Sequence, residues 1–253
     1  MIRLVSDVHG AVAALAREAP GDSPLLVLGD LINFIDYRDN EGIVSEVAGQ
    51  DFVDKIVSFR SVGDFTAAGE LWRSHSKGRE DEFKGRYVAA IAEAYAEICA
   101  TLDGVEAYVT YGNVDNPAVL ESHLPDSAVF VEAGVFEIDG MTVGIVGGGV
   151  PTINSPGEIS DDEMAERLKG IGPVDMLCTH VAPAIHPLAT DVIGGRAKGS
   201  QAVLGYIEQY QPRFHYFGDI HQPQAVSWGI GATLSRNIGY FRATGRVFVH
   251  DAG

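Results

Sequence analysis

Five short apolar runs, each followed closely by glycine, aspartate, asparagine or histidine, constrain the fold of this 253-residue chain more than any other feature. A short apolar run with polar residues at its carboxyl end is typical of a buried strand. We therefore expect strands at residues 2–5, 25–28, 107–110, 174–179 and 214–217.

Other patterns indicate how these strands are connected. Helical periodicity at residues 11–19 and 200–209 suggests alternation of strands and helices, and hence a partly parallel sheet. Residues 135–139 and 141–146 are rich in strand-forming residues and flank Asp139-Gly140, a favoured hairpin turn. The expected class is α/β, with some antiparallel pairing.

The segment between the second and third runs has helical character. From Phe83 to Leu102, apolar residues recur every three or four positions, as on the buried face of a helix. We expect a helical insertion over roughly residues 34–105, within a single domain that spans residues 1–253. Residues 72–86 mix basic and acidic side chains, which favours a solvated helix face, and a lid over a substrate is the alternative.

Composition and charge exclude several classes of protein. The chain is 46% hydrophobic, which is enough for a substantial core. A formal net charge of -17 argues against general nucleic-acid binding, which needs a basic surface. No apolar stretch is long enough for a signal peptide or a membrane span, so we expect a cytoplasmic protein with no membrane partner. Cys99 and Cys178 are predicted to be small buried hydrophobes.

The polar residues that follow the runs are of types that coordinate divalent metals. Asp7 and His9 are two positions apart, so both side chains would leave one face if the strand continued through them. The carboxylate of Asp30 has two oxygens with which it could bridge two cations. The candidate ligands are Asp7, His9, Asp30, Asn113, His180, Asp219 and His221.

Each of these residues has a plainer interpretation when it is taken alone. An Asp-x-His pattern occurs by chance, Gly29-Asp30 is a common turn, and Asp115 could simply nucleate another turn. Taken together, the candidates follow one another at the carboxyl ends of predicted strands. Open α/β sheets gather their ligand-binding residues at that edge, so we predict one shared metal site.

The ordered motifs Asp7-x-His9, Gly29-Asp30, Gly112-Asn113, His180 and Gly218-x-x-His221 resemble those of the calcineurin-like metallophosphoesterases. The resemblance implies a four-layer α-β-β-α sandwich and a centre with two divalent metal ions. It further implies that Asp7, His9, Asp30 and His221 hold one ion. Asp30, Asn113, His180 and Asp219 would hold the other, and Asn113 and His180 would also bind the substrate.

The chain departs from the family pattern at two positions. Val114 stands where the family usually has a histidine that assists the leaving group. General acid catalysis contributes about 10²- to 10⁴-fold, so we expect substrates with good leaving groups unless His123, His186 or a water takes this role. Asp219 stands where the family has histidine in Gly-His-x-His. An added oxygen ligand favours harder ions, so among Mn, Fe, Zn and Mg we favour Mn²⁺.

The expected function is hydrolysis of a phosphodiester, in a small phosphoester or nucleotide-type substrate, by a water activated between two metal ions. We assign no catalytic side chain beyond the metal-bound water. Family members with a substitution where Val114 stands resemble phosphodiesterases, which favours a diester. The alternatives are a phosphomonoesterase or protein phosphatase on the same centre, and a non-catalytic binding protein with this fold. No oligomeric state follows from the sequence.

Overall fold

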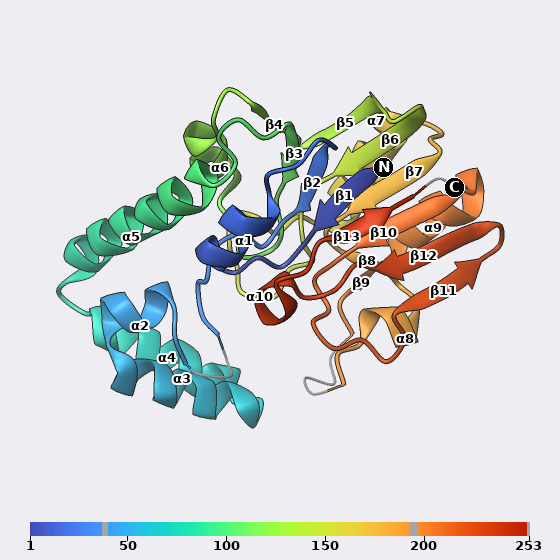
Figure 1. The fold of residues 1–253 in the computed structure, drawn as a ribbon. Helices are drawn as coiled ribbons and strands as arrows, with labels where there is room; N and C mark the ends of the chain where they lie inside the picture. The colour runs from blue at the N-terminus through green and yellow to red at the C-terminus, as the bar shows by residue number, and fades with distance from the viewer. Residues whose placement is uncertain (37–39, 193–196, 252–253) are drawn as a thin grey trace. The chain divides into compact units, whose positions relative to one another are not determined.

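The computed structural model describes residues 1–36, 40–192 and 197–251 (Figure 1). The chain divides into two compact units, one formed by residues 1–31 and 97–253 and the other by residues 32–96. All seven candidate ligands belong to the first unit, so its two main sheets are what position the site.

Three of the predicted strands lie in a five-stranded sheet with the order β13-β1-β2-β3-β4. Strands β1 to β4 are parallel, and β13 is antiparallel to β1. Because parallel neighbours end at the same edge of a sheet, the loops after β1, β2 and β3 meet there. The strands are β1 (Ile2–Val5), β2 (Leu25–Leu28), β3 (Ala107–Thr110), β4 (Ala128–Phe130) and β13 (Phe248–His250).

The other two predicted strands belong to a six-stranded sheet with the order β11-β12-β10-β7-β6-β5. Its central strands β6, β7, β10 and β12 are parallel, so the loops after β7 and β10 also meet at one edge. A separate small sheet pairs β8 (Ala182–Pro183) with β9 (Gly199–Ser200). The six strands are β5 (Ala133–Ile138), β6 (Met141–Val146), β7 (Met176–Thr179), β10 (Phe214–Phe217), β11 (Ser227–Ile230) and β12 (Thr233–Asn237).

Strands β5 and β6 form the predicted hairpin. Asp139 and Gly140 connect them with φ angles of 52° and 75°, and positive φ at both positions is what a type I′ turn requires. Ile138 pairs with Met141 directly across the turn. The hairpin prediction is confirmed.

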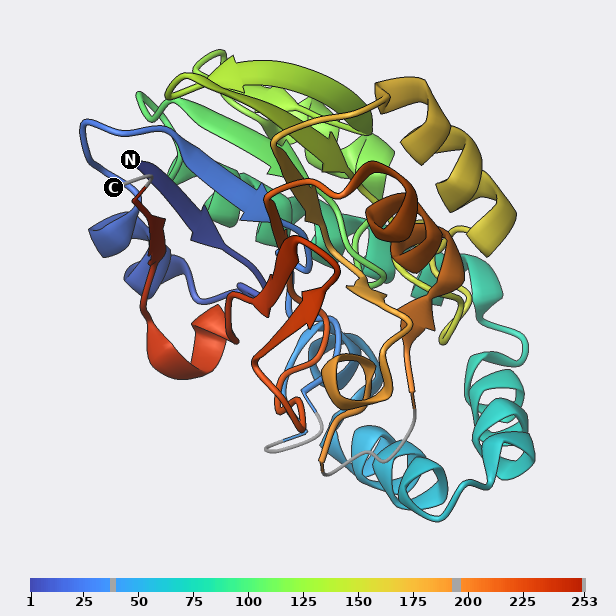
Figure 2. The ribbon, with the colours of Figure 1, turned by 90° about the vertical axis from the view of Figure 1, so that its right-hand side faces the viewer.

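The two main sheets pack face to face through a shared apolar core (Figures 1 and 2). Leu4 and Leu26 from the five-stranded sheet belong to one buried cluster with Ile145 and Met176 from the six-stranded sheet. All four residues of β2 are buried, so this strand is covered on both faces. That explains why its sequence is a continuous apolar run rather than an alternating one.

Helices α7 (Asp161–Ile171) and α9 (Gln201–Tyr210) cover the other face of the six-stranded sheet. Buried side chains of both helices share a cluster with Leu177 of β7. Leu177 points away from Met176, its neighbour in the core between the sheets, because successive strand residues face opposite sides. The α/β class, with sheets and helices in layers, is confirmed, and the four-layer sandwich stays a prediction.

The same unit contains the short helices α1 (Val12–Glu18), α6 (Pro117–His123), α8 (His186–Ala189) and α10 (Phe241–Thr244). The predicted helices at residues 11–19 and 200–209 correspond to α1 and α9. Helix α6 follows the Asn113 loop and begins with strong local signals. The side chain of Asn116 accepts a hydrogen bond from the backbone N–H of Val119, and a proline occupies the start of the helix.

The unit of residues 32–96 is helical in its described part. Val44, Phe52 and Ile56 lie in its apolar core. The interpretation of this region as an insertion over roughly residues 34–105, within a single domain, stays a prediction. None of the described helices is long and apolar enough to cross a membrane. The helices are α2 (Ile43–Ala48), α3 (Gln50–Ser61), α4 (Phe65–Ser76) and α5 (Glu80–Ala100), which continues past residue 96.

Replacing Ile145 by alanine should lower the free energy of unfolding by about 2–5 kcal/mol, because it leaves a cavity between the sheets. Ile145 is fully buried, whereas Val135 on the neighbouring strand β5 is 43% exposed. The control Val135→Ala should cost less than about 1 kcal/mol. Urea unfolding followed by circular dichroism measures both. Equal losses in the two variants would contradict the location of the core.

Candidate metal centre

Loops, rather than strands, present the candidate ligands. Strand β1 ends at Val5, so Asp7 and His9 lie beyond it, and the condition under which both would leave one strand face is not met. Asp7, His9, Asp30 and Asp219 have φ angles of 56°, 41°, 54° and 62°. Residues other than glycine rarely adopt this left-handed conformation, and those that do are concentrated at functional sites. The same left-handed backbone conformation therefore occurs at four of the seven candidate ligands.

Asp7, His9 and His221 form one group that could hold a cation. The Nε2 atoms of His9 and His221 are 3.1 Å apart, and His221 Nε2 lies 3.4 Å from Asp7 Oδ1. His9 Nε2 also lies 3.6 Å from Asp30 Oδ2. The structure thus brings together the four residues expected around the first ion.

Asp7, Asp30 and His180 form a second such group. His180 Nε2 lies 3.4 Å from Asp30 Oδ1 and 3.4 Å from the amide oxygen of Asn113. Asn113 is buried, and its backbone carbonyl oxygen accepts a hydrogen bond from the hydroxyl of Ser155. Asp219 lies near this group through its backbone N–H, which donates to Asp7 Oδ2 at 3.1 Å.

Asp30 stands between the two groups. Its Oδ2 faces the imidazole of His9, and its Oδ1 faces that of His180. The two groups of potential ligands also share Asp7, so a bridging role is open to both carboxylates. We favour Asp30, because its two oxygens point at different imidazoles. The role of all seven residues as metal ligands stays a prediction.

The charges of these side chains shift one another's pKa values. Burial raises the pKa of Asp30, but the charge and hydrogen bond of His180, together with the charge of His9, outweigh it and hold that pKa well below its usual range. Burial lowers the pKa of His180, but Asp30 and, to a smaller degree, Asp7 and Asp219 raise it to about 10. Both effects favour the ionised carboxylate and the protonated imidazole as partners.

Two carboxylate oxygens at the centre are left without a hydrogen bond in the described part of the chain. They are Asp7 Oδ1 and Asp219 Oδ2, and both are buried. Asp7 Oδ1 still has the imidazole of His221 at 3.4 Å, whereas Asp219 Oδ2 is a buried anionic oxygen with no such partner among the residues described. An oxygen of that kind is costly to bury, and a cation beside it would remove the cost. The donor set of carboxylate oxygens, imidazole nitrogens and one amide oxygen is also one that divalent metals accept. The residues present therefore fit a metal centre.

The imidazole of His180 is oriented by its other nitrogen. Its Nδ1 donates to the backbone carbonyl of Leu28 at 2.8 Å, which directs Nε2 toward Asp30. A hydrogen bond of this kind fixes the tautomer of histidine ligands in metal sites. Next to it, the hydroxyl of Thr179 hydrogen-bonds to the fully buried His215, whose other ring nitrogen bonds Ser235.

Asp115 connects two loops of the centre, a role that the sequence did not indicate beyond a turn. Its Oδ2 accepts from the N–H groups of Asp30 and Gly112 at 2.7 and 2.9 Å, and its Oδ1 accepts from Leu31 at 3.0 Å. Burial and the charge of Asp30 raise the pKa of Asp115 to about 6. This buried carboxylate therefore holds the Asp30 and Asn113 loops together.

Gly112 permits the close approach of those loops. A Cβ atom at this position would collide with Asp30 Oδ1 and with the ring of His180. Glycine is thus required before Asn113 because a side chain there would collide with two candidate ligands, and not because of its own φ angle.

Tyr240 and Arg242 support the first group, and neither carries a sequence signal that we recognised. The ring of Tyr240 stacks on that of His221 with centroids 3.9 Å apart and planes 3° from parallel. Arg242 donates from Nη1 to the carbonyl oxygen of His9 at 2.7 Å. Its backbone N–H donates to the carbonyl oxygen of Asp7. The C-terminal segment therefore fixes the loop that presents Asp7 and His9.

Three residues bear on the question of a general acid: Val114, His123 and His186. The backbone N–H of Val114 donates to Asp30 Oδ1 at 3.1 Å, so this residue positions the carboxylate through its main chain. His123 donates from Nδ1 to the carbonyl oxygen of Val119 within α6. His186 is the first residue of α8.

Lys198 also lies directly at the centre, although it is outside the set of candidate ligands. Its Nζ is 3.2 Å from Asp219 Oδ1. Lys198 precedes β9 in a segment without a recognisable motif, so its location depends on the tertiary fold alone.

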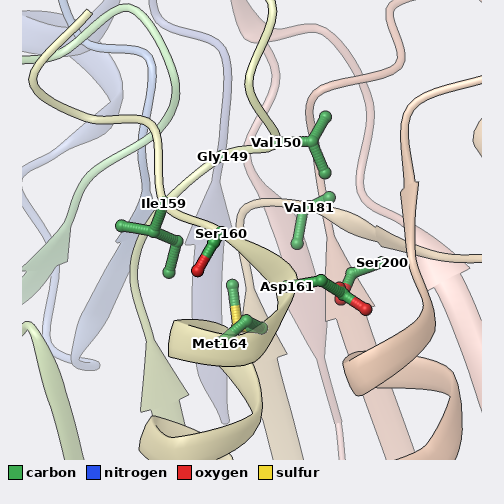
Figure 3. Close-up of a pocket in the computed structure, with 8 residues that line it drawn as sticks. All are labelled: Gly149, Val150, Ile159, Ser160, Asp161, Met164, Val181 and Ser200. Atoms are coloured by element: carbon green, nitrogen blue, oxygen red, sulfur yellow. The ribbon is translucent and has the colours of Figure 1, made fainter.

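A small cavity lies between the start of α7 and the point where β9 ends and α9 begins (Figure 3). Gly149, Asp161, Val181 and Ser200 are among its lining residues, and its volume is about 10 Å³. A single water needs about 10–15 Å³ on this measure, so the cavity is too small for a substrate.

Comparisons with known proteins show the fold alone. No protein-family model matches the chain, and no curated protein matches it either. One solved structure covers 95% of this chain and 90% of its own, with 14% identity and a TM-score of 0.56. The crystal structure of TT1561 of Thermus thermophilus covers 98% of this chain and 96% of its own, with 14% identity and a TM-score of 0.55. The chain shares its overall fold with these two proteins.

A third solved structure, described as a novel archaeal phosphodiesterase, covers 96% of this chain and 86% of its own, with 12% identity. Its TM-score is 0.38, which is too low to support an inference about this chain. Membership of the metallophosphoesterase family therefore stays a prediction from the motifs.

Replacing Asp115 by asparagine should lower the free energy of unfolding by about 1–3 kcal/mol, because an NH₂ group would then face backbone N–H donors in a buried site. The exposed Asp126, changed to asparagine in the same way, should stay within about 0.5 kcal/mol of the parent. Chemical unfolding curves compare the two. If Asp115→Asn matched its control, the three hydrogen bonds would not be structural.

Proposed function

We propose that this chain is a metal-dependent phosphoesterase of the calcineurin-like kind, with a four-layer sandwich fold, that hydrolyses phosphodiesters with two divalent cations. The observation that carries the proposal is the position of Asp30, whose two carboxylate oxygens face different imidazoles at 3.6 and 3.4 Å. A carboxylate placed in this way is suited to bridging two ions. The unpartnered buried oxygen of Asp219 supports the same conclusion.

The ligands divide between two positions. Asp7, His9 and His221 would hold one ion, and Asn113, His180 and Asp219 the other, with Asp30 shared. The set is rich in oxygen, which favours Mn²⁺ over Zn²⁺. When bound, two such ions lower the pKa of a water toward neutrality and stabilise charge on a phosphoryl group.

The protein side chains supply position and charge. Asn113 and His180, whose side chains lie 3.4 Å apart, would contact a substrate phosphate, and the N–H of Val114 keeps Asp30 oriented. Val114 has no proton to give, so the chain should act best on esters whose leaving group needs no protonation. A phosphodiester in a small or nucleotide-type molecule, in the cytoplasm, is the proposed substrate class.

Replacing Asp30 by asparagine tests the bridge. Asparagine keeps an oxygen for the N–H of Val114 but loses the charge and the second oxygen. Loss of groups that merely orient metal ligands already costs about 10- to 100-fold, so kcat/KM should fall by at least about 100-fold. Turnover of chromogenic phosphodiesters and phosphomonoesters with Mn²⁺, together with metal content, measures the effect.

The control is again Asp126→Asn, which should retain full activity and metal. If the folded Asp30→Asn protein turned over like the parent, the mechanism would be wrong. A parent protein that bound metal but hydrolysed neither class of ester would instead be a binding protein. Faster hydrolysis of the monoester would replace the diester with the alternative substrate.

Metal binding should release protons. Asp30 raises the pKa of His180 to about 10, so this imidazole carries a proton at neutral pH, whereas a ligating imidazole is neutral. Because the ion must displace this proton, Mn²⁺ affinity should rise with pH between about 6 and 9, by about tenfold per unit for each proton released. Calorimetric titration in buffers of different ionisation enthalpy counts the protons. Affinity independent of pH would refute this charge state.

A further inference from the structure

Lys198 is a cationic side chain that contacts the side chain of a candidate ligand, and the sequence offered no role for it. Its Nζ approaches Asp219 Oδ1 at 3.2 Å, and its side chain is 32% exposed whereas that of Asp219 is 1% exposed. The side chain of Lys198 is therefore partly open to solvent, and its ammonium group ends against a buried carboxylate. A ligand that reached Asp219 would meet this group.

The ammonium group is held at the centre by charge. Asp219 raises the pKa of Lys198 above its usual value, burial opposes this, and the charges of Asp30 and Asp7 add to the rise. Lys198 is thus a positive charge that contacts Asp219 and is stabilised by the charges of Asp30 and Asp7. A compact ammonium group of this kind is a common binding group for phosphate.

Lys198 also has hydrogen-bonding capacity to spare. An ammonium group has three N–H donors, and the side chain of Lys198 makes one hydrogen bond within residues 1–36, 40–192 and 197–251. The remaining donors have no protein partner in that part of the chain. They are available to an anion placed over the ligands.

The side chain at position 114 offers no cationic hydrogen-bond donor to a substrate. There the side chain is aliphatic, and its contribution to the site is a backbone N–H that Asp30 already occupies. A fixed donor aimed at the charge that develops in a transition state is often the largest electrostatic contribution to catalysis.

We infer that Lys198 binds the phosphoryl group of the substrate, and that Asp219 holds the lysine in position for this contact. The inference rests on the proposed function and deepens it, because it assigns a substrate-binding residue outside the expected ligand set. Lys198 binds a non-bridging phosphate oxygen and remains protonated throughout. No bond to Lys198 is made or broken.

The competing role for Lys198 is purely structural, in which the ammonium group offsets the charge of Asp219. The two roles lead to different expected results when the lysine is replaced by a neutral residue. A structural lysine would change metal content or stability when it is neutralised. A phosphate-binding lysine would change the affinity for phosphate at unchanged metal content.

The test uses the full-length protein loaded with Mn²⁺ and the variants Lys198→Met and Lys198→Arg. Inorganic phosphate is the probe, with its Kd measured by calorimetry and its inhibition constant measured against a chromogenic phosphodiester. Metal content and melting temperature are recorded for each protein. The matched control is Lys169→Met, which removes a lysine that is 76% exposed in the same unit.

Lys198→Met should weaken phosphate binding by about 10- to 100-fold and lower kcat/KM by about 100-fold, with parental metal content. Lys198→Arg should restore part of both, because it keeps the charge with a different shape. Lys169→Met should match the parent. If Lys198→Met does not fold, Lys198→Gln takes its place as the neutral variant.

Unchanged phosphate affinity in a folded, metal-loaded Lys198→Met protein overturns the inference and leaves the proposed function standing. Loss of metal together with phosphate affinity overturns it as well, because the lysine then acts through the ions. A parent protein that takes up no metal and hydrolyses no ester overturns the proposed function and this inference with it.

Discussion

The mutual repulsion of four buried carboxylates is the constraint on which the centre depends. Asp7, Asp30, Asp115 and Asp219 are all buried, and the charge of Asp30 adds to burial in raising the pKa of Asp115. Like charges in a medium of low dielectric repel strongly, and each charge also loses its hydration. A fold that gathers such groups must surround them with compensating donors.

The compensation comes from three kinds of group. Asp115 is satisfied by backbone N–H groups, Asp30 by two imidazoles and one backbone N–H, and Asp219 by an ammonium group on one of its oxygens. In the described part of the chain, one oxygen each on Asp7 and Asp219 has no hydrogen bond, although Asp7 Oδ1 lies 3.4 Å from the imidazole of His221. Both oxygens belong to predicted metal ligands, so divalent ions bound there would complete the balance.

The fold class and the order of the ligands could be predicted because they rest on local patterns. Apolar runs such as Leu25–Leu28 have the length of strands, Asp139-Gly140 carries the φ preferences of its turn, and parallel strands bring distant loops to one edge. Asp30 and His180, 150 positions apart in sequence, follow strands of different sheets, so their contact also requires the two sheets to pack against each other.

The supporting groups could not be predicted, because their contacts depend on tertiary packing. Asp115 has the local appearance of a turn residue, yet its carboxylate is fixed by amides from the Asp30 loop. Tyr240 and Lys198 belong to no periodic pattern, and they reach the centre because the segments that precede α10 and β9 lie beside it. Asp7 and His9 come together in a left-handed loop, because strand β1 ends at Val5 and does not continue through them, which was the condition for their sharing a strand face.

Asp219 and Lys198 are best understood together. Aspartate at position 219 adds a negative charge to a cluster that already holds three buried carboxylates. The ammonium group of Lys198 lies 3.2 Å from Asp219 Oδ1 and offsets that charge. Asp219 Oδ2 is left as a buried oxygen without a hydrogen bond among the described residues. Under the proposed function, this oxygen would face a cation, and Lys198 would be the group that meets the phosphoryl group of the substrate.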